Sequence, residues 1–134
     1  MPTGITSSAA LNEAALEGRR QFLDTGSANA RIRLYNGTRP TSGGTATTML
    51  VEIPLDKPCG VVAGGVLTLA STAVPLVANS GNASWARIVN GNGDFAFDCD
   101  VSTVAAGTGQ IQLEDTSLLA GGKTQLVSGV LGQP

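Results

Sequence analysis

Residues 85–101 read WARIVNGNGDFAFDCDV, and this stretch decides the fold. Two runs suited to β-strands, 85–89 and 95–101, flank five residues of Asn, Gly and Asp. Such a turn between two strand-like runs is a strong local signal for an antiparallel hairpin. The sequence therefore predicts a β protein organised around this hairpin.

The second run alternates apolar with small or charged residues, a period of two that is typical of a strand with one buried face. Its apolar face consists of Phe95, Phe97, Cys99 and Val101. If Trp85 also points inward, the hairpin places three of the four Phe and Trp residues of the chain in one core. The opposite face, with Asp98 and Asp100, is expected to meet water.

The N-terminal part of the chain has a different pattern. Residues 1–8 contain Pro2, Gly4 and several Ser and Thr residues, so we expect an extended arm. Residues 9–26 have apolar side chains at helical spacing and predict one amphipathic helix. The stripe expected to be buried is Leu11, Ala14, Ala15, Gly18 and Phe22. Because this stripe has few large side chains, the helix must dock on another surface to be stable.

Residues 27–134 are predicted to form a single β-sandwich domain. Seven to nine short strands are expected there, separated by turns rich in Gly, Pro and Asn. They fall at about 30–35, 47–55, 61–70, 74–78, 85–89, 95–101, 110–114 and 124–131. Strands do not alternate with helices, which disfavours a parallel α/β sheet. The predicted fold class is mainly β: an antiparallel β-sandwich, of which a jelly-roll-like arrangement is one form, with one N-terminal amphipathic helix.

Composition limits the partners that we expect. Charged residues make up 13% of the 134 residues, against about 25% in an average globular domain. This low charge fits a chain that hides much of its surface against neighbours, and equally an ordinary β protein rich in small residues. The eight Lys and Arg residues do not form one basic cluster, so we expect no nucleic-acid partner. No apolar run is long enough for a membrane helix, so no membrane partner is expected either.

The sequence does not predict an enzyme. It contains no histidine, so neither a Ser-His-Asp nor a Cys-His arrangement can form within it. Cys59 has only Lys57 close by in sequence to activate a thiol, and Cys99 has the position of a small buried hydrophobe. We expect no catalytic residue and no cofactor.

One turn has the residue types of a calcium loop. Asn90, Asn92 and Asp94 offer alternating oxygen ligands. However, Phe95 follows where a calcium loop has Gly, and no Glu closes the loop at the required distance. The other interpretation is a turn in which Asn and Asp side chains bond their own backbone.

The sequence also indicates the kind of compartment in which the chain is assembled. Residues 1–15 lack the basic start and apolar core of a secretion signal. Two cysteines do not make a disulfide framework, and free thiols favour assembly in a reducing compartment. We therefore expect assembly in a reducing compartment.

Three stretches resemble small structural proteins of tailed-bacteriophage virions. The first is LYNGTRP at 34–40, continuing through Gly43-Gly44 to TTML at 47–50. The second is WARIV at 85–89, followed by the polar turn and Phe97-Asp98, and the third is Thr116-Ser117 with Ala120-Gly121 before the last strand. The resemblance covers most of residues 30–130 and consists of turn and strand patterns.

The resemblance implies a virion structural protein, in the first place a capsid decoration (cement) protein on the capsid exterior, made in the cytoplasm of the host cell. Its implied partners are the major capsid protein and further copies of itself, as a dimer or trimer. Residues taken as candidates for partner binding are Pro2, Ile5, Leu11, Arg19, Arg20, Tyr35 and Arg39. Two alternatives stay open: a tail, connector or fibre component of the same kind of virion, and a carbohydrate- or calcium-binding β module. For the latter, Trp85, Tyr35 and the Asn90 turn are the candidate ligand groups.

Overall fold

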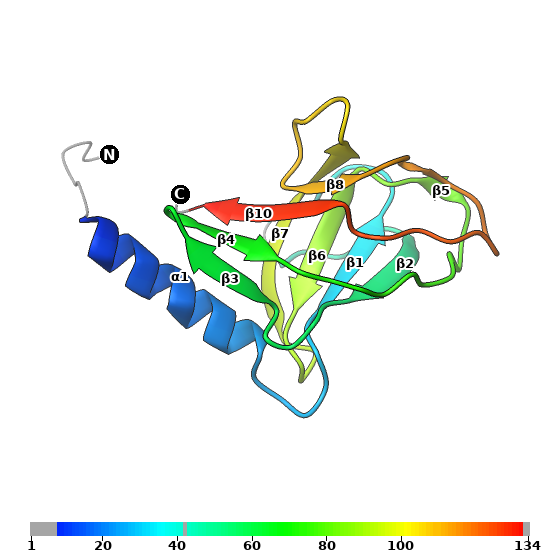
Figure 1. The fold of residues 1–134 in the computed structure, drawn as a ribbon. Coiled ribbons are helices and arrows are strands. Elements are labelled where there is room, and N and C mark those ends of the chain that lie inside the picture. The colour runs from blue at the N-terminus through cyan, green and yellow to red at the C-terminus, as the bar shows by residue number, and fades with distance from the viewer. Residues whose placement is uncertain (1–7, 42, 133–134) are drawn as a thin grey trace.

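A computed structural model describes residues 8–41 and 43–132 (Figure 1). The fold within these residues is mainly β, with one N-terminal helix, α1 (Ala9–Leu23), as the sequence predicts. The strands are β1 (Arg31–Tyr35), β2 (Met49–Pro54), β3 (Gly60–Ala63), β4 (Val66–Leu69), β5 (Gly81–Asn82), β6 (Trp85–Val89), β7 (Phe95–Thr103), β8 (Ile111–Leu113), β9 (Ser117–Leu118) and β10 (Ser128–Gly132).

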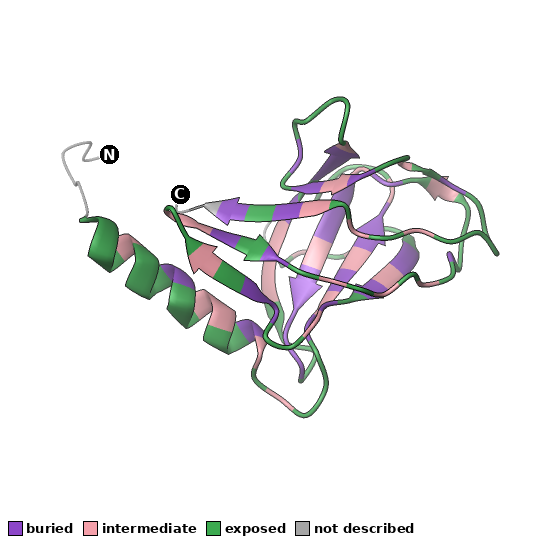
Figure 2. Cartoon of the chain, viewed as in Figure 1, coloured by how far each residue is buried: buried purple, intermediate pink, exposed green. Residues whose placement is uncertain are grey.

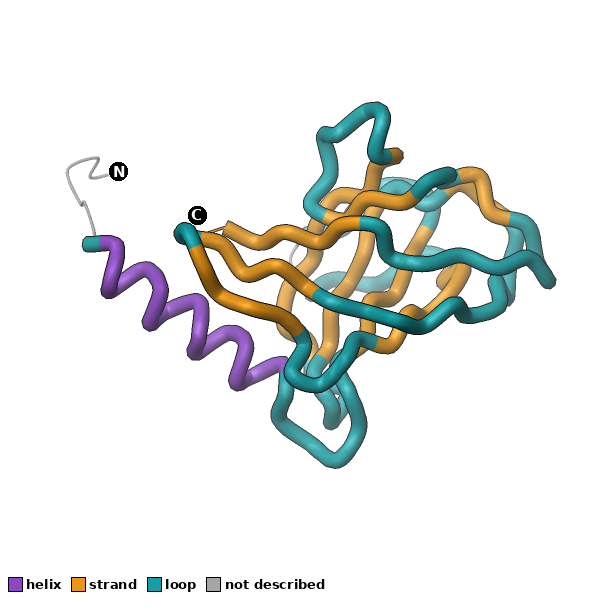
Figure 3. Tube along the Cα trace, viewed as in Figure 1, coloured by secondary structure: helices purple, strands orange, loops and turns teal. Residues whose placement is uncertain are grey.

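Eight of these strands form one curled sheet in the order β2-β1-β6-β7-β8-β10-β4-β3. The sheet folds over on itself, so that β3, β4 and β10 form a front layer and β7 begins a rear layer that continues through β6, β1 and β2 (Figures 1 and 3). Every pairing is antiparallel except β7 with β8, which is parallel. The predicted sandwich is thus one curled, mixed sheet, because the chain crosses from β7 to β8 through residues 104–110 instead of turning back.

The central hairpin is confirmed at its predicted place. β6 pairs with β7, with Ala86 opposite Cys99 and Ile88 opposite Phe97, and these residues face the interior. The register shifts between Ile88 and Val89, so Phe95 lies opposite Val89 instead of continuing the inward alternation. Phe95 is therefore on the outer face, and the prediction that it shares a face with Phe97 is wrong.

Two further strand predictions need correction. Alternation places Leu50 and Val51 on opposite faces of β2, yet both are buried. A register shift between Leu34 and Tyr35 explains this, because Leu34 pairs with Val51 and Tyr35 with Met49, which leaves Leu50 unpaired in a bulge. The predicted strand at 74–78 is reduced to one isolated bridge, Leu76 with Lys123, since Pro75 cannot donate to a ladder.

Helix α1 begins at a conventional cap and ends earlier than predicted. The hydroxyl of Ser8 accepts a hydrogen bond from the backbone N–H of Leu11 at 3.1 Å. The helix ends at Leu23, not at residue 26, and Asp24 caps it. The Asp24 carboxylate accepts the backbone N–H of Cys59 at 2.9 Å, which ties the end of the helix to the start of β3.

The buried face of α1 is not the predicted one. Leu16 and Leu23 are fully buried against β3 and β4, whereas Leu11 is 60% exposed and Phe22 43% exposed. Leu16 and Leu23 are two turns apart on one face, and both side chains are removed completely from water. The predicted stripe therefore faces outward.

Two glycines let the α1–β1 connection pack on the β6–β7 turn. A Cβ on Gly91 would lie 2.1 Å from the carbonyl oxygen of Ala28, and a Cβ on Gly26 would lie 2.6 Å from the carbonyl carbon of Gly91. Gly26 also has φ 110°, a conformation that other residues rarely adopt. This contact fixes where β1 enters the sheet beside β6.

The first prediction concerns Gly91. Replacement by Ala should destabilise the fold by about 1 to 3 kcal/mol, because the new methyl group has no room against backbone atoms. Gly18→Ala is the matched control, since a Cβ at Gly18 meets nothing within 4 Å. Because Ala is a better helix former than Gly, this substitution should raise the free energy of unfolding by up to about 1 kcal/mol. Urea unfolding measures both, and equal effects of the two substitutions would contradict the close packing at Gly91.

Candidate interaction surfaces

The outer face of β2, β1, β6 and β7 carries a row of charges. The register aligns Glu52, Arg33, Arg87 and Asp98 side by side across the four strands. Arg33 Nε lies 2.8 Å from Glu52, and Arg87 Nε lies 2.8 Å from Asp98. The hydrogen bonds that Arg87 donates to the Asp98 carboxylate raise the pKa of the Arg87 guanidinium. The row is thus charge-balanced within the chain.

The connection 36–48 covers the next row of this outer face. Trp85 stacks on Tyr35 with ring centroids 4.4 Å apart, and Arg87 lies over the Trp85 ring at 5.4 Å. The indole N–H of Trp85 donates to the backbone carbonyl of Asn36 and to the Thr47 hydroxyl, both at 3.1 Å. Arg87 Nη2 donates to the carbonyl of Gly44 at 2.7 Å. These contacts hold the connection down on the sheet.

This arrangement shows where the two rings lie. Trp85 is buried, 1% exposed, but under the 36–48 connection on the outer face instead of in the core with Phe97. Tyr35 is buried beside it and has no surface to offer a partner. Both rings are therefore unavailable as a platform for a carbohydrate ligand.

The Asn90 turn uses its side-chain oxygen internally. Asn90 is buried, and its Oδ1 accepts backbone N–H groups from Asn92 at 3.0 Å and Asp94 at 2.9 Å. These bonds match the interpretation of the turn as self-bonded. A calcium ion at this turn would compete with them for the same oxygen. Among the residues that the structure describes, no group of three or more His, Cys, Asp or Glu side chains could hold a metal ion.

Both thiols are free and buried. Burial raises the pKa of Cys59 from its ordinary 9.0 to about 12, with Asp24 adding to the effect. Burial likewise raises the pKa of Cys99 to about 12. Because the thiolate is the reactive form, neither side chain is an available nucleophile in the folded protein.

The helix end of the molecule presents an apolar groove. On one side α1 contributes Ala15, Gly18, Arg19 and Phe22, and on the other β7 contributes residues 95–97. This α1–β7 groove has a volume of about 580 Å³. Phe22 and Phe95 line the groove and are both exposed, so much of its surface is apolar.

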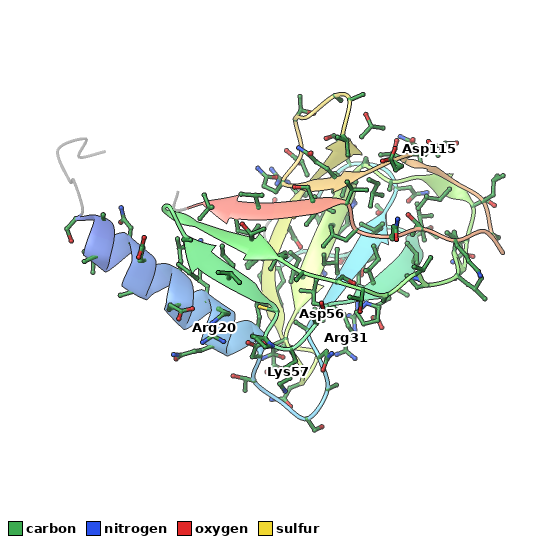
Figure 4. All side chains as sticks on the ribbon, in the orientation of Figure 1. Arg20, Arg31, Asp56, Lys57 and Asp115 are labelled. Carbon is green, nitrogen blue, oxygen red and sulfur yellow. The ribbon has the colours of Figure 1, made fainter. Side chains whose placement is uncertain are left out.

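The opposite end carries a second apolar surface. Its exposed side chains are Val74, Leu76 and Leu119, which we call the loop-end surface. Leu76 is 62% exposed and Leu119 72% exposed. The backbone N–H of Val77 donates to the carbonyl of Gly122, and the N–H of Gly121 donates to the carbonyl of Val77. These hydrogen bonds join the two segments that carry the exposed side chains. A groove of about 430 Å³ next to them is bordered by Glu114 and Asp115. In Figure 4, Asp115 lies far from Arg20 on α1.

The residues proposed from sequence for partner binding do not form one surface. Leu11 is exposed on α1, and Arg19 lines the α1–β7 groove. Arg20 instead pairs with Glu17 at 2.6 Å and Asp24 at 2.9 Å, which anchors the helix. Arg39 is exposed, and its Nη1 lies 3.4 Å from Oδ1 of Asp100. Pro2 and Ile5 lie outside the described residues.

Sequence reasoning missed Phe95 and the loop-end surface. Phe95 reads as buried by alternation, and only the shifted register turns it outward. Leu119 stands in a short apolar pair, Leu118-Leu119, before Ala120-Gly121-Gly122. The neighbouring turn glycines are the one sequence signal that could have indicated that the second Leu is exposed.

The second prediction tests the covered ring. Trp85→Ala should destabilise the fold by about 3 to 5 kcal/mol, because it removes a large buried side chain and leaves a cavity. Trp85→Phe keeps the stack on Tyr35 and loses only the N–H donor, so its cost should be about 1 to 2 kcal/mol. Urea unfolding measures both, and a near-neutral Trp85→Ala would show that the ring is not held as described.

The third prediction concerns pH. Because the folded-state pKa of both thiols is raised, the unfolded chain loses these protons first as pH rises above 9.0. Stability should be unaffected by the thiols below pH 9 and should fall between pH 9 and 12, by about 1.4 kcal/mol per pH unit for each thiol. Urea midpoints of the wild type and a Cys59→Ala, Cys99→Ala variant provide the comparison. Identical slopes above pH 9 would contradict the burial of the thiols.

No family model, curated protein or solved structure matches this chain. Over the part of the chain that the structure describes, no helix has the length and apolar character needed to span a membrane.

Proposed function

We propose that this chain is a virion structural protein of a tailed bacteriophage, in the first place a capsid decoration protein that binds and stabilises the assembled shell of the major capsid protein. The observation that carries the proposal is the position of the exposed large apolar side chains. Leu11 and Phe22 lie at one end of the molecule, and Leu76 and Leu119 lie at the other. Figure 2 shows the exposed outer half of α1 and the exposed loops at the far end.

Two separated apolar ends suit a subunit that touches neighbours on two sides. Exposed apolar patches on a soluble protein mark sites of interaction. The covered outer face and the internally paired Arg87 and Asp98 leave fewer groups there for a partner. A charged fraction of 13% also fits a surface that neighbours cover. In this proposal the loop-end surface contacts the capsid shell.

The direct test is the number of copies in purified particles of the phage that encodes the chain. Quantitative mass spectrometry should find hundreds of copies per particle, and antibody labelling should place them on the capsid exterior. A few copies or tens of copies would indicate a tail, connector or fibre component instead. Complete absence from the particles would overturn a virion role.

The fourth prediction concerns the loop-end surface. The double variant Leu76→Asp, Leu119→Asp should bind purified capsid shells at least tenfold more weakly, because it places two charges in an apolar contact. Val104→Asp is the matched control, since Val104 is an exposed apolar residue in the loop after β7. Co-sedimentation with shells measures binding, and urea unfolding checks that both variants fold. Equal binding by the double variant and the control would remove the loop end from the contact.

A further inference from the structure

One edge of the segment 122–125 has no strand paired with it in the described part of the chain. The other edge pairs with residues 75–77 around the bridge between Leu76 and Lys123. The two bonds that flank this bridge run from the N–H of Val77 to the carbonyl of Gly122 and from the N–H of Thr124 to the carbonyl of Pro75. In an antiparallel pair with this pattern, the residue between the bonds points its own N–H and C=O groups away from the partner strand. Among the described residues, those groups of Lys123 make no hydrogen bond. An open edge of this kind is a template for an added strand.

The same segment borders the groove of about 430 Å³ next to the loop-end surface, which we call the loop-end groove. The rest of its lining comes from Val74, Val77 and residues of the segment 114–119. Val77 and Leu118 are buried, whereas Val74 is 50% exposed and Leu119 is 72% exposed. The groove therefore offers aliphatic side chains to an apolar group that lies beside the open edge.

Two carboxylates at the loop-end groove have no ionic partner among the described residues. Glu114 and Asp115 are both exposed and both line the groove. The ion pairs of the described chain use other carboxylates. One oxygen of Asp115 accepts the backbone N–H of Ser117 at 2.9 Å, a bond that does not neutralise its charge. Lys123 is the one cation among the described residues that line the groove, so negative charge is in excess there. A positively charged side chain is the complement of this site.

We propose that the loop-end groove binds an extended segment of the major capsid protein, which adds as a β-strand along residues 122–125. The backbone of that segment exchanges hydrogen bonds with the N–H and C=O groups of Lys123. An aliphatic side chain of the segment packs on Val74 and Leu119, and a Lys or Arg side chain pairs with the carboxylates of Glu114 and Asp115. This assignment rests on the proposed function, in which the loop end contacts the shell, and it states what chemistry the shell must present.

The open main-chain groups favour a strand over a helix as the occupant. A helix uses its own N–H and C=O groups internally, so it would take water away from those of Lys123 without replacing the lost hydrogen bonds. A strand offers a donor and an acceptor along its edge and leaves alternate side chains to enter the groove. The described chain begins with α1 and ends with β10, and both of these ends lie far from Asp115 (Figures 1 and 4). This position favours another molecule as the source of the strand.

The fifth prediction is protection of one backbone amide. Hydrogen exchange of the full chain is compared with and without an excess of purified capsid shells, with mass-spectrometric fragmentation that resolves residues 122–126. On the shells the Lys123 N–H should exchange at least tenfold more slowly, because the added strand accepts its hydrogen bond. The N–H of Ala105, in the exposed loop after β7, is the control. It also makes no hydrogen bond among the described residues, and its exchange rate should not change.

A pair of charge variants provides a second measurement. Glu114→Gln, Asp115→Asn removes both carboxylates, and Asn keeps an oxygen that can accept the N–H of Ser117. This variant should co-sediment with shells about fivefold more weakly than the wild type. The matched control is Glu13→Gln, Asp94→Asn, which removes the same charge from α1 and from the β6–β7 turn. Its binding should stay within about twofold of the wild type, because exposed charges far from a contact contribute little.

The outcomes separate the added strand from the proposed function. If the wild type binds shells but the Lys123 amide exchanges as fast as in the free chain, the added strand is overturned and the decoration role stands. Equal binding by the two charge variants would overturn the pairing of a Lys or Arg side chain with Glu114 and Asp115. If the wild type does not bind shells, the proposed function fails and the added strand fails with it.

Discussion

The hydrogen bonds that Arg87 donates to the Asp98 carboxylate and to the backbone carbonyl of Gly44 organise the outer face of the central strands. They hold the 36–48 connection over the outer face of the sheet, and Trp85 and Tyr35 are buried beneath that connection. On the inner side the same hairpin contributes Ala86 and Ile88 to the core. The central strands are thus covered on both faces, and the largest apolar residues still exposed lie mainly toward the ends of the molecule.

The central strands are covered on both faces, whereas the two ends of the molecule expose large apolar side chains. We propose that these exposed ends let the chain join an assembly. At the helix end, Leu16 and Leu23 are buried while Leu11 and Phe22 are exposed, and Phe22 also lines the α1–β7 groove. At the loop end, Leu76 and Leu119 are exposed on segments joined by backbone bonds. The two ends are separate surfaces, and we propose that the loop end is the one that contacts the capsid shell.

The sequence predicted the mainly β class, the N-terminal helix and the central hairpin, because turn residues and alternation are local signals. It did not predict the orientation of Phe95, Leu50 or the helix stripe. The first two depend on register shifts, which form only when strands pair. The third depends on which helix face finds the larger apolar surface, a tertiary choice. For the same reason the groove could not be predicted, since it joins a helix and a strand about 75 residues apart in the chain.

The central claim is that both ends of this protein are contact surfaces in a larger particle. A cryo-electron microscopy map of the intact phage, with this chain located in it, tests that claim most directly. If our proposal is correct, the map will show the loop end of each copy against the capsid shell and the helix end in contact with a neighbouring subunit. A map in which the chain is absent, or stands as a single subunit with both ends in solvent, would contradict it.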